Sequence, residues 1–497
     1  MAQDRRQGLN KALIERLGDA LQTDLFINGD WLPAQGKQRF EVINPATNEV
    51  LTTVADASAP DIELAIVAAV QAQASWSKVP PPERSAILYR WYSLIAEHRE
   101  ALAHLLTLEQ GKPLKEALGE IDYGASYVNW FAGEATRIYG DILPSKSEKL
   151  RSRVIKKPVG VVVAITPWNF PNAMLARKLA PALASGCAVI VKPAAETPLS
   201  ALAIAALATQ AGVPAGVINV LPTRDSAGFG EQVCQDTRIH KLTFTGSTPV
   251  GKTLAKQSAG TLKRLSLELG GNAPFIVFGD ADLPLAVKGA IASKFRNAGQ
   301  TCVCANRFYI EKAVFDEFVS LLLPQLDQLV MGKGVDEGVN LGPLISPKAV
   351  EKVAELVKEA CDQGAQQAYQ ATIPEGLLGS FYPPTLLTNV PSNARILKEE
   401  IFGPVMTLVE FEGEEQAIGL ANATPFGLAA YVYTSCRKRL ARLPEQLDAG
   451  LLGLNTGLIS NEMAPFGGVK ESGWGREGSK YGLDDYLSIM SVTESFE

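Results

Sequence analysis

Two cysteines separated by one residue, Cys302 and Cys304, lie in the segment Arg296-Asn-Ala-Gly-Gln-Thr-Cys-Val-Cys-Ala-Asn-Arg307. A cysteine thiolate can add to a carbonyl carbon, and collapse of the tetrahedral adduct can expel a hydride and leave a thioester. Cys302 follows a Gly-Gln turn, which favours an exposed position, so we interpret it as a candidate nucleophile for this chemistry. The alternative is the commonest fate of a free cysteine, a small apolar side chain packed in a core.

A thioester has to be released by water, and the carboxylate of Glu268 is the candidate base. It lies in Leu267-Glu-Leu-Gly-Gly271, as a lone acid between two leucines followed by two glycines. Partial burial in such a setting would raise its pKa and suit it to accept a proton from water. The alternative is a carboxylate held in a salt bridge at the end of a strand.

Two polar side chains follow runs that are typical of buried strands. The run Val159-Gly-Val-Val-Val-Ala-Ile-Thr166 leads into Trp168-Asn169, and the run Ala188-Val-Ile-Val-Lys192 ends in a lysine. In an open α/β sheet, ligands bind at the carboxyl ends of the strands. There the Asn169 amide could donate to an oxyanion, and Lys192 could reach a ribose or a phosphate. An Asx turn and a solvated lysine are the structural alternatives.

The segment Gly246-Ser-Thr-Pro-Val-Gly-Lys-Thr253 fits the phosphate-loop pattern GxxxxGK[ST]. A phosphate-loop NTPase is therefore a candidate from another class of protein. Against it, Pro249 lacks the backbone N–H with which such a loop holds phosphate. The simpler alternative is that Gly246 and Ser247 place a helix N-terminus against the pyrophosphate of a dinucleotide, although no GxGxxG fingerprint follows any expected strand.

These segments belong to an alternation of strands and helices that organises most of the chain. Strands are expected at 159–166, 188–192, 217–221 and 241–245, alternating with helices at 172–185, 198–211, 225–234 and from 246 onward. Residues 272–450 repeat the alternation, with strands near 274–278, 307–310, 405–409 and 429–433 and helices near 283–297, 313–330, 347–363 and 415–423. Short strands are expected within 24–55, and helices over 59–110 and 114–138. This pattern predicts a doubly wound, parallel α/β fold.

The composition sets the limits of the interpretation. A chain of 497 residues is too long for one compact core, so two or three domains are expected. The net charge of −6 gives no general attraction to nucleic acid or to an anionic membrane. No apolar run reaches the roughly 18–20 residues of a membrane span.

Cysteine and histidine usage gives two further expectations. Six cysteines are too few for a disulfide scaffold, so a reducing compartment, the cytoplasm, is expected. None of the three histidines pairs with cysteine at metal-ligand spacing, so no metal site is expected. Near the N-terminus, leucines recur every fourth residue and predict an amphipathic helix within residues 1–22 in place of a targeting segment. These are Leu9, Leu13, Leu17 and Leu21.

Taken together, a set of segments resembles the motifs of the aldehyde dehydrogenase superfamily. They occur in the family's order and span nearly the whole chain, so the set is specific although each member is weak. The segments are Pro167-Trp-Asn-Phe-Pro171, Lys192-Pro193, Phe244-Thr-Gly-Ser247, Leu267-Glu-Leu-Gly-Gly271, Gly299-Gln-Thr-Cys302, Glu400-Ile-Phe-Gly-Pro404 and Pro465-Phe-Gly-Gly-Val-Lys470. The resemblance favours the chemical interpretation of each residue above and makes the phosphate-loop match a coincidence.

The resemblance implies two Rossmann-like α/β domains and a small β extension that joins subunits into a homo-oligomer, either a dimer or a tetramer. The dinucleotide-binding domain is expected at 1–140 and 160–270, the catalytic domain at 271–465, and the extension at 141–159 and 466–497. Cys302 is implied to be the nucleophile and Glu268 the general base, and Asn169 and the Cys302 backbone N–H would form the oxyanion hole. The residues implied to hold the cofactor are Trp168, Lys192, Ala195, Gly246, Ser247, Glu400 and Phe402.

A narrower resemblance is to the succinate-semialdehyde dehydrogenases. The segments that carry it are Gly299-Gln-Thr-Cys-Val-Cys304, Ala176-Arg-Lys178, Asn455-Thr-Gly-Leu-Ile-Ser460 and Gly473-Trp-Gly-Arg-Glu-Gly-Ser-Lys-Tyr481. It implies a short aldehyde with a distal carboxylate, although glutarate-semialdehyde and other ω-carboxy aldehyde enzymes look similar. Arg177 and Arg296 would then face the substrate, with Ser460 beside them, because the arginine fork matches a carboxylate.

The resemblance also bears on the cofactor and on redox regulation. In this family the residue three after the strand-end lysine lies near the adenosine ribose, and a Glu there favours NAD because it would repel a 2′-phosphate. Here that residue is Ala195, so we expect NADP to be accepted and preferred, with NAD possible. Glu196 is the competing feature, although a turn residue one place along should face away. Cys304 is expected to pair with an oxidised Cys302, the alternative being that it only packs.

Overall fold

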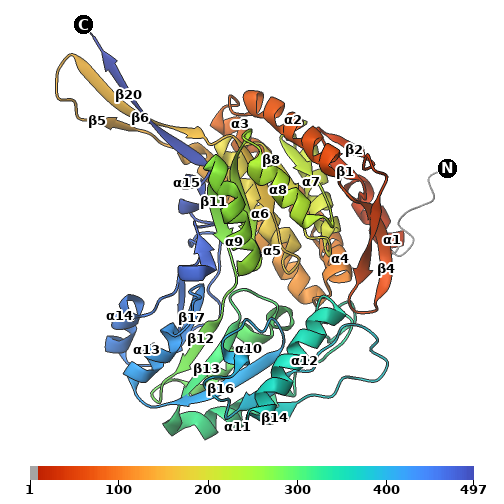
Figure 1. Ribbon diagram of the computed structural model, residues 1–497, viewed down its shortest axis with the longest axis vertical. Helices are drawn as coiled ribbons and strands as arrows, with labels where there is room; N and C mark the ends of the chain where they lie inside the picture. The colour runs from red at the N-terminus through yellow and green to blue at the C-terminus, as the bar shows by residue number, and fades with distance from the viewer. Residues whose placement is uncertain (1–8, 10, 497) are drawn as a thin grey trace.

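Parallel strands form the centre of two α/β domains in the computed structural model, which describes residue 9 and residues 11–496 (Figure 1). The first sheet has parallel strands in its middle and antiparallel strands at both edges. Its eight strands lie in the order β19 (Gly473–Trp474), β11 (Arg264–Glu268), β10 (Ile239–Thr245), β7 (Val161–Ile165), β8 (Val189–Lys192), β9 (Ile218–Val220), β1 (Leu25–Ile27) and β2 (Asp30–Leu32).

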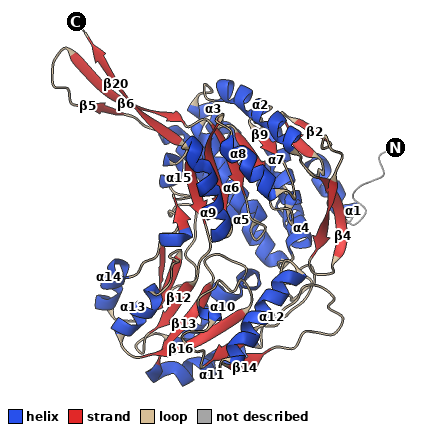
Figure 2. Ribbon diagram, in the orientation of Figure 1, coloured by secondary structure: helices blue, strands red, loops and turns tan. Residues whose placement is uncertain are grey.

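Helices cover both faces of the first sheet, as Figure 2 shows. They are α2 (Ala59–Trp76), α3 (Pro81–Glu97), α4 (Arg99–Gln110), α5 (Leu114–Glu134), α6 (Pro171–Ser185), α7 (Pro198–Gln210), α8 (Ser226–Gln235) and α9 (Thr248–Ser258). Successive strand side chains point to opposite faces of a sheet. Val162 and Ala164 therefore join the apolar cluster that contains α3 to α7, whereas Val161 and Val163 join the cluster of α2, α8 and α9.

The second sheet is parallel except at one edge, where its first strand is antiparallel to the second. Its seven strands lie in the order β14 (Gln366–Gln370), β15 (Thr385–Thr388), β16 (Val405–Phe411), β13 (Ala305–Glu311), β12 (Ala273–Val277), β17 (Ala429–Tyr433) and β18 (Leu451–Leu454). The helices around it are α10 (Leu283–Phe295), α11 (Phe315–Leu326), α12 (Pro347–Asp362), α13 (Glu414–Asn422) and α14 (Arg437–Gln446). Two doubly wound domains result, as the alternation predicted.

A three-stranded arm projects from the first domain (Figure 1). Its strands lie in the order β20 (Leu487–Ser495), β6 (Leu150–Pro158) and β5 (Asp141–Leu143), all antiparallel. The arm exposes large apolar side chains, including Ile142 at 84% and Ile489 at 74%. The remaining elements are α1 (Lys11–Leu17), the hairpin of β3 (Arg39–Asn44) and β4 (Glu49–Ala55), and α15 (Tyr481–Asp484).

The structure corrects several details of the expected elements. The helical stretch 59–110 is three helices: the first ends at Trp76, the second begins at Pro81 after Pro80, and His98 separates the second from the third. The sequence reading missed β11, β14, β15, β18 and α14, all short or polar segments. Part of the expected extension, β19, instead pairs with β11 in the first sheet.

The N-terminal leucines are buried, but α1 begins only at Lys11, and residues 1–8 and 10 of the expected helix lie outside the described residues. Among the residues that the structure describes, no helix combines the length and the apolar character needed to cross a membrane.

Candidate active site

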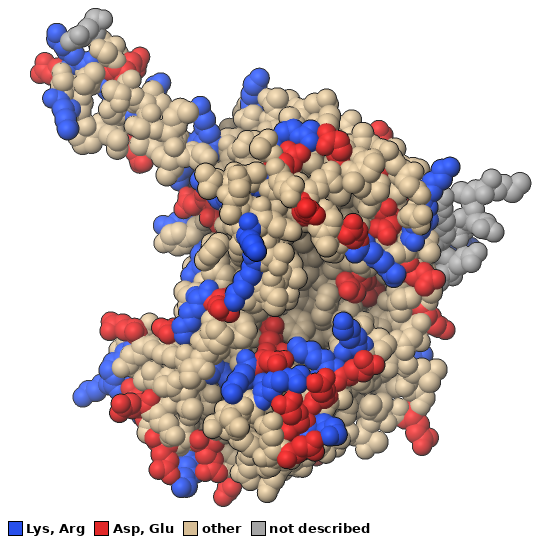
Figure 3. Space-filling model, in the orientation of Figure 1, with Lys and Arg blue, Asp and Glu red and all other residues tan. Residues whose placement is uncertain are grey.

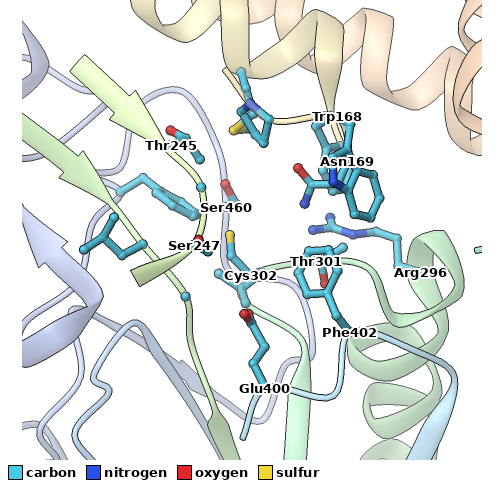
Figure 4. A pocket seen from close by; sticks show the side chains of 18 of the residues that line it. Trp168, Asn169, Thr245, Ser247, Arg296, Thr301, Cys302, Glu400, Phe402 and Ser460 are labelled. Carbon is cyan, nitrogen blue, oxygen red and sulfur yellow. The ribbon is translucent and has the colours of Figure 1, made fainter. Parts of the chain in front are cut away.

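A cavity of about 330 Å³ lies between the two α/β domains and brings together side chains from both. The first domain contributes the loop after β7, and the second contributes the loop before β13. Figure 4 shows the Cys302 sulfur facing the same space as the Asn169 amide and the Arg296 guanidinium. Figure 3 shows the hollow between the domains from outside, with acidic and basic side chains mixed around it.

Cys302 owes its position to an unusual turn. Asn297 and Ala298, both with a φ of 53°, precede Gly299 with a φ of 78°. A Cβ on Gly299 would lie 2.3 Å from the Gly403 carbonyl oxygen, so only glycine fits. The turn leaves Cys302 partly exposed to the cavity. Burial and the nearby Glu400 carboxylate raise the pKa of the Cys302 thiol to about 12, so the resting form is the protonated thiol.

Asn169 lies at the carboxyl end of β7, and hydrogen bonds hold both its side-chain amide and its backbone carbonyl. Its side-chain amide donates to the Gln300 carbonyl at 3.0 Å, which leaves its second N–H for the cavity. The backbone carbonyl of Asn169 accepts hydrogen bonds from Lys112 Nζ at 2.8 Å and from the Asn297 side-chain amide at 3.0 Å. These bonds place a hydrogen-bond donor beside the Cys302 sulfur, as an oxyanion site requires.

Glu268 ends β11 and is almost fully buried, at 3% exposed. Neither of its carboxylate oxygens accepts a hydrogen bond from any described residue. Burial and the neighbouring Glu477 carboxylate raise the pKa of Glu268 well above its ordinary value. Its side chain is not part of the wall of the Cys302 cavity and instead approaches Gly467. Glu268 therefore has the proton affinity of a base, but its side chain is directed toward Gly467 and not into the cavity of Cys302.

The two arginines expected at the substrate both line the cavity, but their surroundings differ. The Arg177 guanidinium lies 2.7 Å from the Glu477 carboxylate and 4.0 Å from the centre of the Phe466 ring. Burial lowers the pKa of Arg177, but the Glu477 charge outweighs burial and holds the pKa above its ordinary value. Arg296 forms no ion pair with any described residue and lies 5.2 Å from the Phe170 ring centre.

Ser460 also lines the cavity, and its hydroxyl forms a hydrogen bond with Tyr123 of α5. The Tyr123 hydroxyl is in turn 3.0 Å from that of Tyr127. Sequence reasoning missed Tyr123 and Glu477, because a tyrosine on a helix and a glutamate in a glycine-rich segment have no spacing signal of their own. Met174, Thr301 and Phe466 complete the apolar and hydroxyl lining.

A second cavity, of about 750 Å³, adjoins the first and shares Trp168, Gly246 and Ser247 with it. Ser247 precedes the first turn of α9, where free backbone N–H groups favour an anion. Among the described residues, the Lys192 ammonium donates to the Pro193 carbonyl alone, at 3.3 Å, so it has further protons to offer. These features fit the pyrophosphate and ribose of a dinucleotide, and the volume suits a ligand of that size.

The remaining expected cofactor residues divide between the two cavities. Ala195 lines the second cavity, and so does Glu196, contrary to the expectation that it faces away. Glu400 and Phe402 line the first, where the Phe402 ring packs edge-on against Trp168 at 5.5 Å. Burial raises the pKa of Glu400 to about 7.

Two other sequence features lie apart from the cavities. Lys252 of the phosphate-loop match pairs with Glu471 at 2.8 Å on the surface and lines neither cavity, so it is not placed to hold a bound nucleotide. Cys304 is buried, and its thiol donates to the Lys294 carbonyl at 3.5 Å. Cys302 and Cys304 are both free thiols in this structure.

Comparison with known proteins places the site in context. The profile of the aldehyde dehydrogenase family matches residues 31–492. The chain is 52% identical to succinate-semialdehyde dehydrogenase [NADP(+)] of Escherichia coli K12 over 93% of its length and 96% of that protein's length. It is 51% identical to glutarate-semialdehyde dehydrogenase of Pseudomonas putida KT2440, with the same coverage of 93% and 96%.

The fold is shared as well. The crystal structure of succinate-semialdehyde dehydrogenase from Burkholderia pseudomallei superimposes with a TM-score of 0.94 at 50% identity, covering 96% of this chain and 99% of that one. The family profile, the similar sequences and the shared fold all point to the same family. The chain belongs to the aldehyde dehydrogenase family.

Proposed function

We propose that the protein oxidises a short aldehyde carrying a distal carboxylate, namely succinate semialdehyde, to the acid. The observation that carries this proposal is the Arg296 guanidinium, which lines the same cavity as Cys302 and has no carboxylate partner among the described residues. Arg296 is half-buried, and a cation without an ion-pair partner at such a position favours a ligand that supplies the opposite charge. Both Arg177 and Ser460 line the cavity with it and add donors for the same carboxylate.

The chemistry assigns one task to each residue. The Cys302 thiol gives its proton to solvent water in the cavity and its sulfur adds to the aldehyde carbon, while the Asn169 amide and the Cys302 backbone N–H stabilise the oxyanion. A nicotinamide dinucleotide held by Trp168, Lys192 and Ser247 would supply the hydride acceptor, and loss of hydride from this carbon would leave a thioester on Cys302. Glu268 then takes a proton from water, whose oxygen attacks the thioester and releases the acid and the Cys302 thiol. For that step the Glu268 side chain must turn from Gly467 toward the cavity.

The test of the substrate is steady-state kinetics of the wild type across semialdehydes of increasing chain length. Succinate semialdehyde should give the highest kcat/KM among them, and butanal, which has the same length without the carboxylate, should be far poorer. Equal activity with butanal would reject the proposal of a carboxylate site.

Glutarate semialdehyde is the second candidate, and a structural feature favours it. A further cavity of about 120 Å³ lies beside the first, with Arg296, Thr301 and Ser460 in the wall common to both. Movement of Arg296 into this space would lengthen the site by about one methylene. A kcat/KM for glutarate semialdehyde above that for succinate semialdehyde would reverse the order of the two candidates.

The proposed cofactor is NADP in preference to NAD. Ala195 removes the carboxylate that would repel a 2′-phosphate, and Lys192 lines the same cavity as a cation. Glu196 lines it too and opposes the preference. Introducing the missing acid, Ala195→Glu, should lower kcat/KM with NADP and raise it with NAD. A wild type that favours NAD, with no change in this variant, would show that the position does not set the choice.

We further propose that the arm joins subunits into a homo-oligomer and that the protein works in the cytoplasm. The exposed apolar side chains of Ile142 and Ile489 support the first proposal. The six cysteines, all free, agree with a reducing compartment. We also propose domain limits near 140, 160, 270 and 465, which separate the strands of the three larger sheets except for β19, a strand of the first sheet. Light scattering should show a dimer or tetramer, and a monomer at micromolar concentration would contradict the first proposal.

A further inference from the structure

An arginine on the rim of the cofactor cavity has no role in the proposed chemistry. Arg224 lies in the loop between β9 and α8, is exposed, and lines the cavity of about 750 Å³ together with Lys192 and Ala195. Strands β8 and β9 are hydrogen-bonded neighbours in the first sheet. The loops at their carboxyl ends therefore lie side by side, one with Lys192, Ala195 and Glu196 and the other with Arg224.

Asp56 shows how near the two loops are to each other. Its Oδ1 atom accepts a hydrogen bond from the Arg224 backbone N–H at 3.0 Å. Burial lowers the pKa of Lys192, and the charges of Glu196 and Asp56 oppose that effect, so the Asp56 carboxylate also faces the Lys192 ammonium. Asp56 thus lies near both positions, which limits the distance between them.

The Arg224 guanidinium is held in place without being neutralised. It lies 5.3 Å from the centre of the Phe40 ring of β3, a contact that orients the planar group and leaves its N–H donors in its own plane. It forms no ion pair with any carboxylate in the described part of the chain, in contrast to Arg39 and Arg238, which are paired at 2.5 Å. An arginine fork that is oriented and unpaired is suited to an oxygen-rich anion.

NAD and NADP differ only at the 2′ position of the adenosine ribose, where NADP carries a phosphate. A phosphate monoester bears between −1.5 and −2 charges near neutral pH. Lys192 alone supplies one positive charge, and the Glu41 and Glu196 carboxylates, which line the same cavity, count against the phosphate. A preference for NADP over NAD therefore requires a second cation, and Arg224 is the arginine that lines this cavity together with Lys192.

We propose that Arg224 is a cofactor-specificity residue, which binds the 2′-phosphate of NADP together with Lys192. The inference rests on the proposed dinucleotide-dependent function and deepens it, because it names the residue that turns tolerance of NADP into preference. It also assigns a role to the Phe40 contact, which keeps the guanidinium at the rim when no cofactor is bound.

The test is calorimetric titration of the purified protein with NADP⁺ and with NAD⁺, both without aldehyde. Arg224→Gln should weaken NADP⁺ binding about 10-fold or more, the usual effect of removing one charge-assisted hydrogen-bonded contact, and change NAD⁺ binding less than about twofold. Arg224→Lys should recover part of the NADP⁺ affinity. Arg437→Gln removes an exposed arginine of α14 that lines neither cavity, and serves as the matched control.

Two results would overturn the inference: unchanged NADP⁺ affinity in Arg224→Gln, or an equal loss of affinity for both cofactors. Repeating the titrations in about 0.5 M salt should reduce the difference between wild type and Arg224→Gln, since screening weakens exposed charge pairs. A difference that grows in salt would also count against it. Because no aldehyde is present, failure of the proposed substrate assignment leaves this measurement decisive.

Discussion

The Arg177 guanidinium lies 2.7 Å from the Glu477 carboxylate, which also accepts a hydrogen bond from Lys178. One buried acid is therefore shared by two buried cations. Arg296, across the same cavity, has no such partner among the described residues. The two arginines are not equivalent: Arg177 is ion-paired before any ligand arrives, whereas Arg296 interacts with the Glu116 carboxylate only at longer range.

The first prediction concerns selectivity for a carboxylate. Arg296→Ala should raise KM for succinate semialdehyde about 10- to 100-fold while changing KM for butanal little, because it removes the unpaired cation. Arg177→Ala should have a smaller effect on the ratio of KM for succinate semialdehyde to KM for butanal, since Glu477 competes for the Arg177 guanidinium. Steady-state kinetics with both aldehydes in both variants measures the ratio. If both substrates lose activity equally in Arg296→Ala, the carboxylate is bound elsewhere.

The second prediction concerns the pH dependence of turnover. Glu268, the proposed base, can accept a proton only when ionised, and its raised pKa means that the ionised fraction increases at a higher pH than for an ordinary carboxyl group. The rate of thioester hydrolysis should therefore increase from acid to alkaline pH. Glu268→Gln should lower steady-state kcat at least about 100-fold and keep the first-turnover burst, because acylation by Cys302 does not require the hydrolytic base.

Rapid-mixing measurements of the burst and of the steady state separate these two steps. The raised pKa of Cys302 makes the burst itself faster at high pH, so the pH profile of each phase has to be recorded in both proteins. A Glu268→Gln variant with the wild-type steady-state rate would remove Glu268 from the hydrolytic step.

The third prediction concerns stability and Glu109. This buried carboxylate of α4 accepts from the backbone N–H groups of Leu199 and Ser200, at 2.9 and 2.8 Å, at the start of α7. Burial outweighs these bonds and raises the pKa of Glu109 from 4.5 to about 7. The contribution to stability is therefore fully present below the unfolded pKa of 4.5 and is lost as pH rises through about 7.

The size of this effect is a few kcal/mol at most, because one pKa unit corresponds to about 1.4 kcal/mol. Glu109→Gln should be less stable than wild type at about pH 5 and should lose less stability between about pH 5 and pH 8. Urea denaturation of both proteins at the two pH values measures the difference. Parallel losses in the two proteins would show that Glu109 does not titrate in this interval.

The fourth prediction concerns oxidation. Cys304 is within two residues of Cys302, but its buried thiol donates to the Lys294 carbonyl, so the 302–304 turn must open for the two sulfurs to pair. Such a close disulfide would be strained and readily reduced. Peroxide should inactivate the wild type reversibly with dithiothreitol, and Cys304→Ser should recover less because its oxidised Cys302 proceeds to the sulfinic acid. Equal recovery would leave Cys304 with a packing role.

The fold class could be predicted from the sequence, whereas many contacts of the site could not, and the reason is physical. Strand and helix periods are local, so apolar runs such as 159–166 were sufficient to place Asn169 at a strand end. The pairing of Lys178 with Glu477 joins residues 299 positions apart, and no local pattern encodes it. The direction of the Glu268 side chain, and the presence of Glu196 in the cavity wall, likewise depend on neighbours that only the folded chain brings together.

The hydrogen bonds of Asn169 to Gln300 and Asn297 fasten the first domain to the second beside the nucleophile. The proposed catalysis thus depends on the interface between two domains, each of which has a hydrophobic core of its own. A shift of a fraction of an ångström at this interface would separate the Asn169 amide from the Cys302 sulfur while both cores remained packed. Turnover measured at increasing urea concentration therefore reports on the alignment of the two domains, and it should be lost before circular dichroism detects any loss of helix.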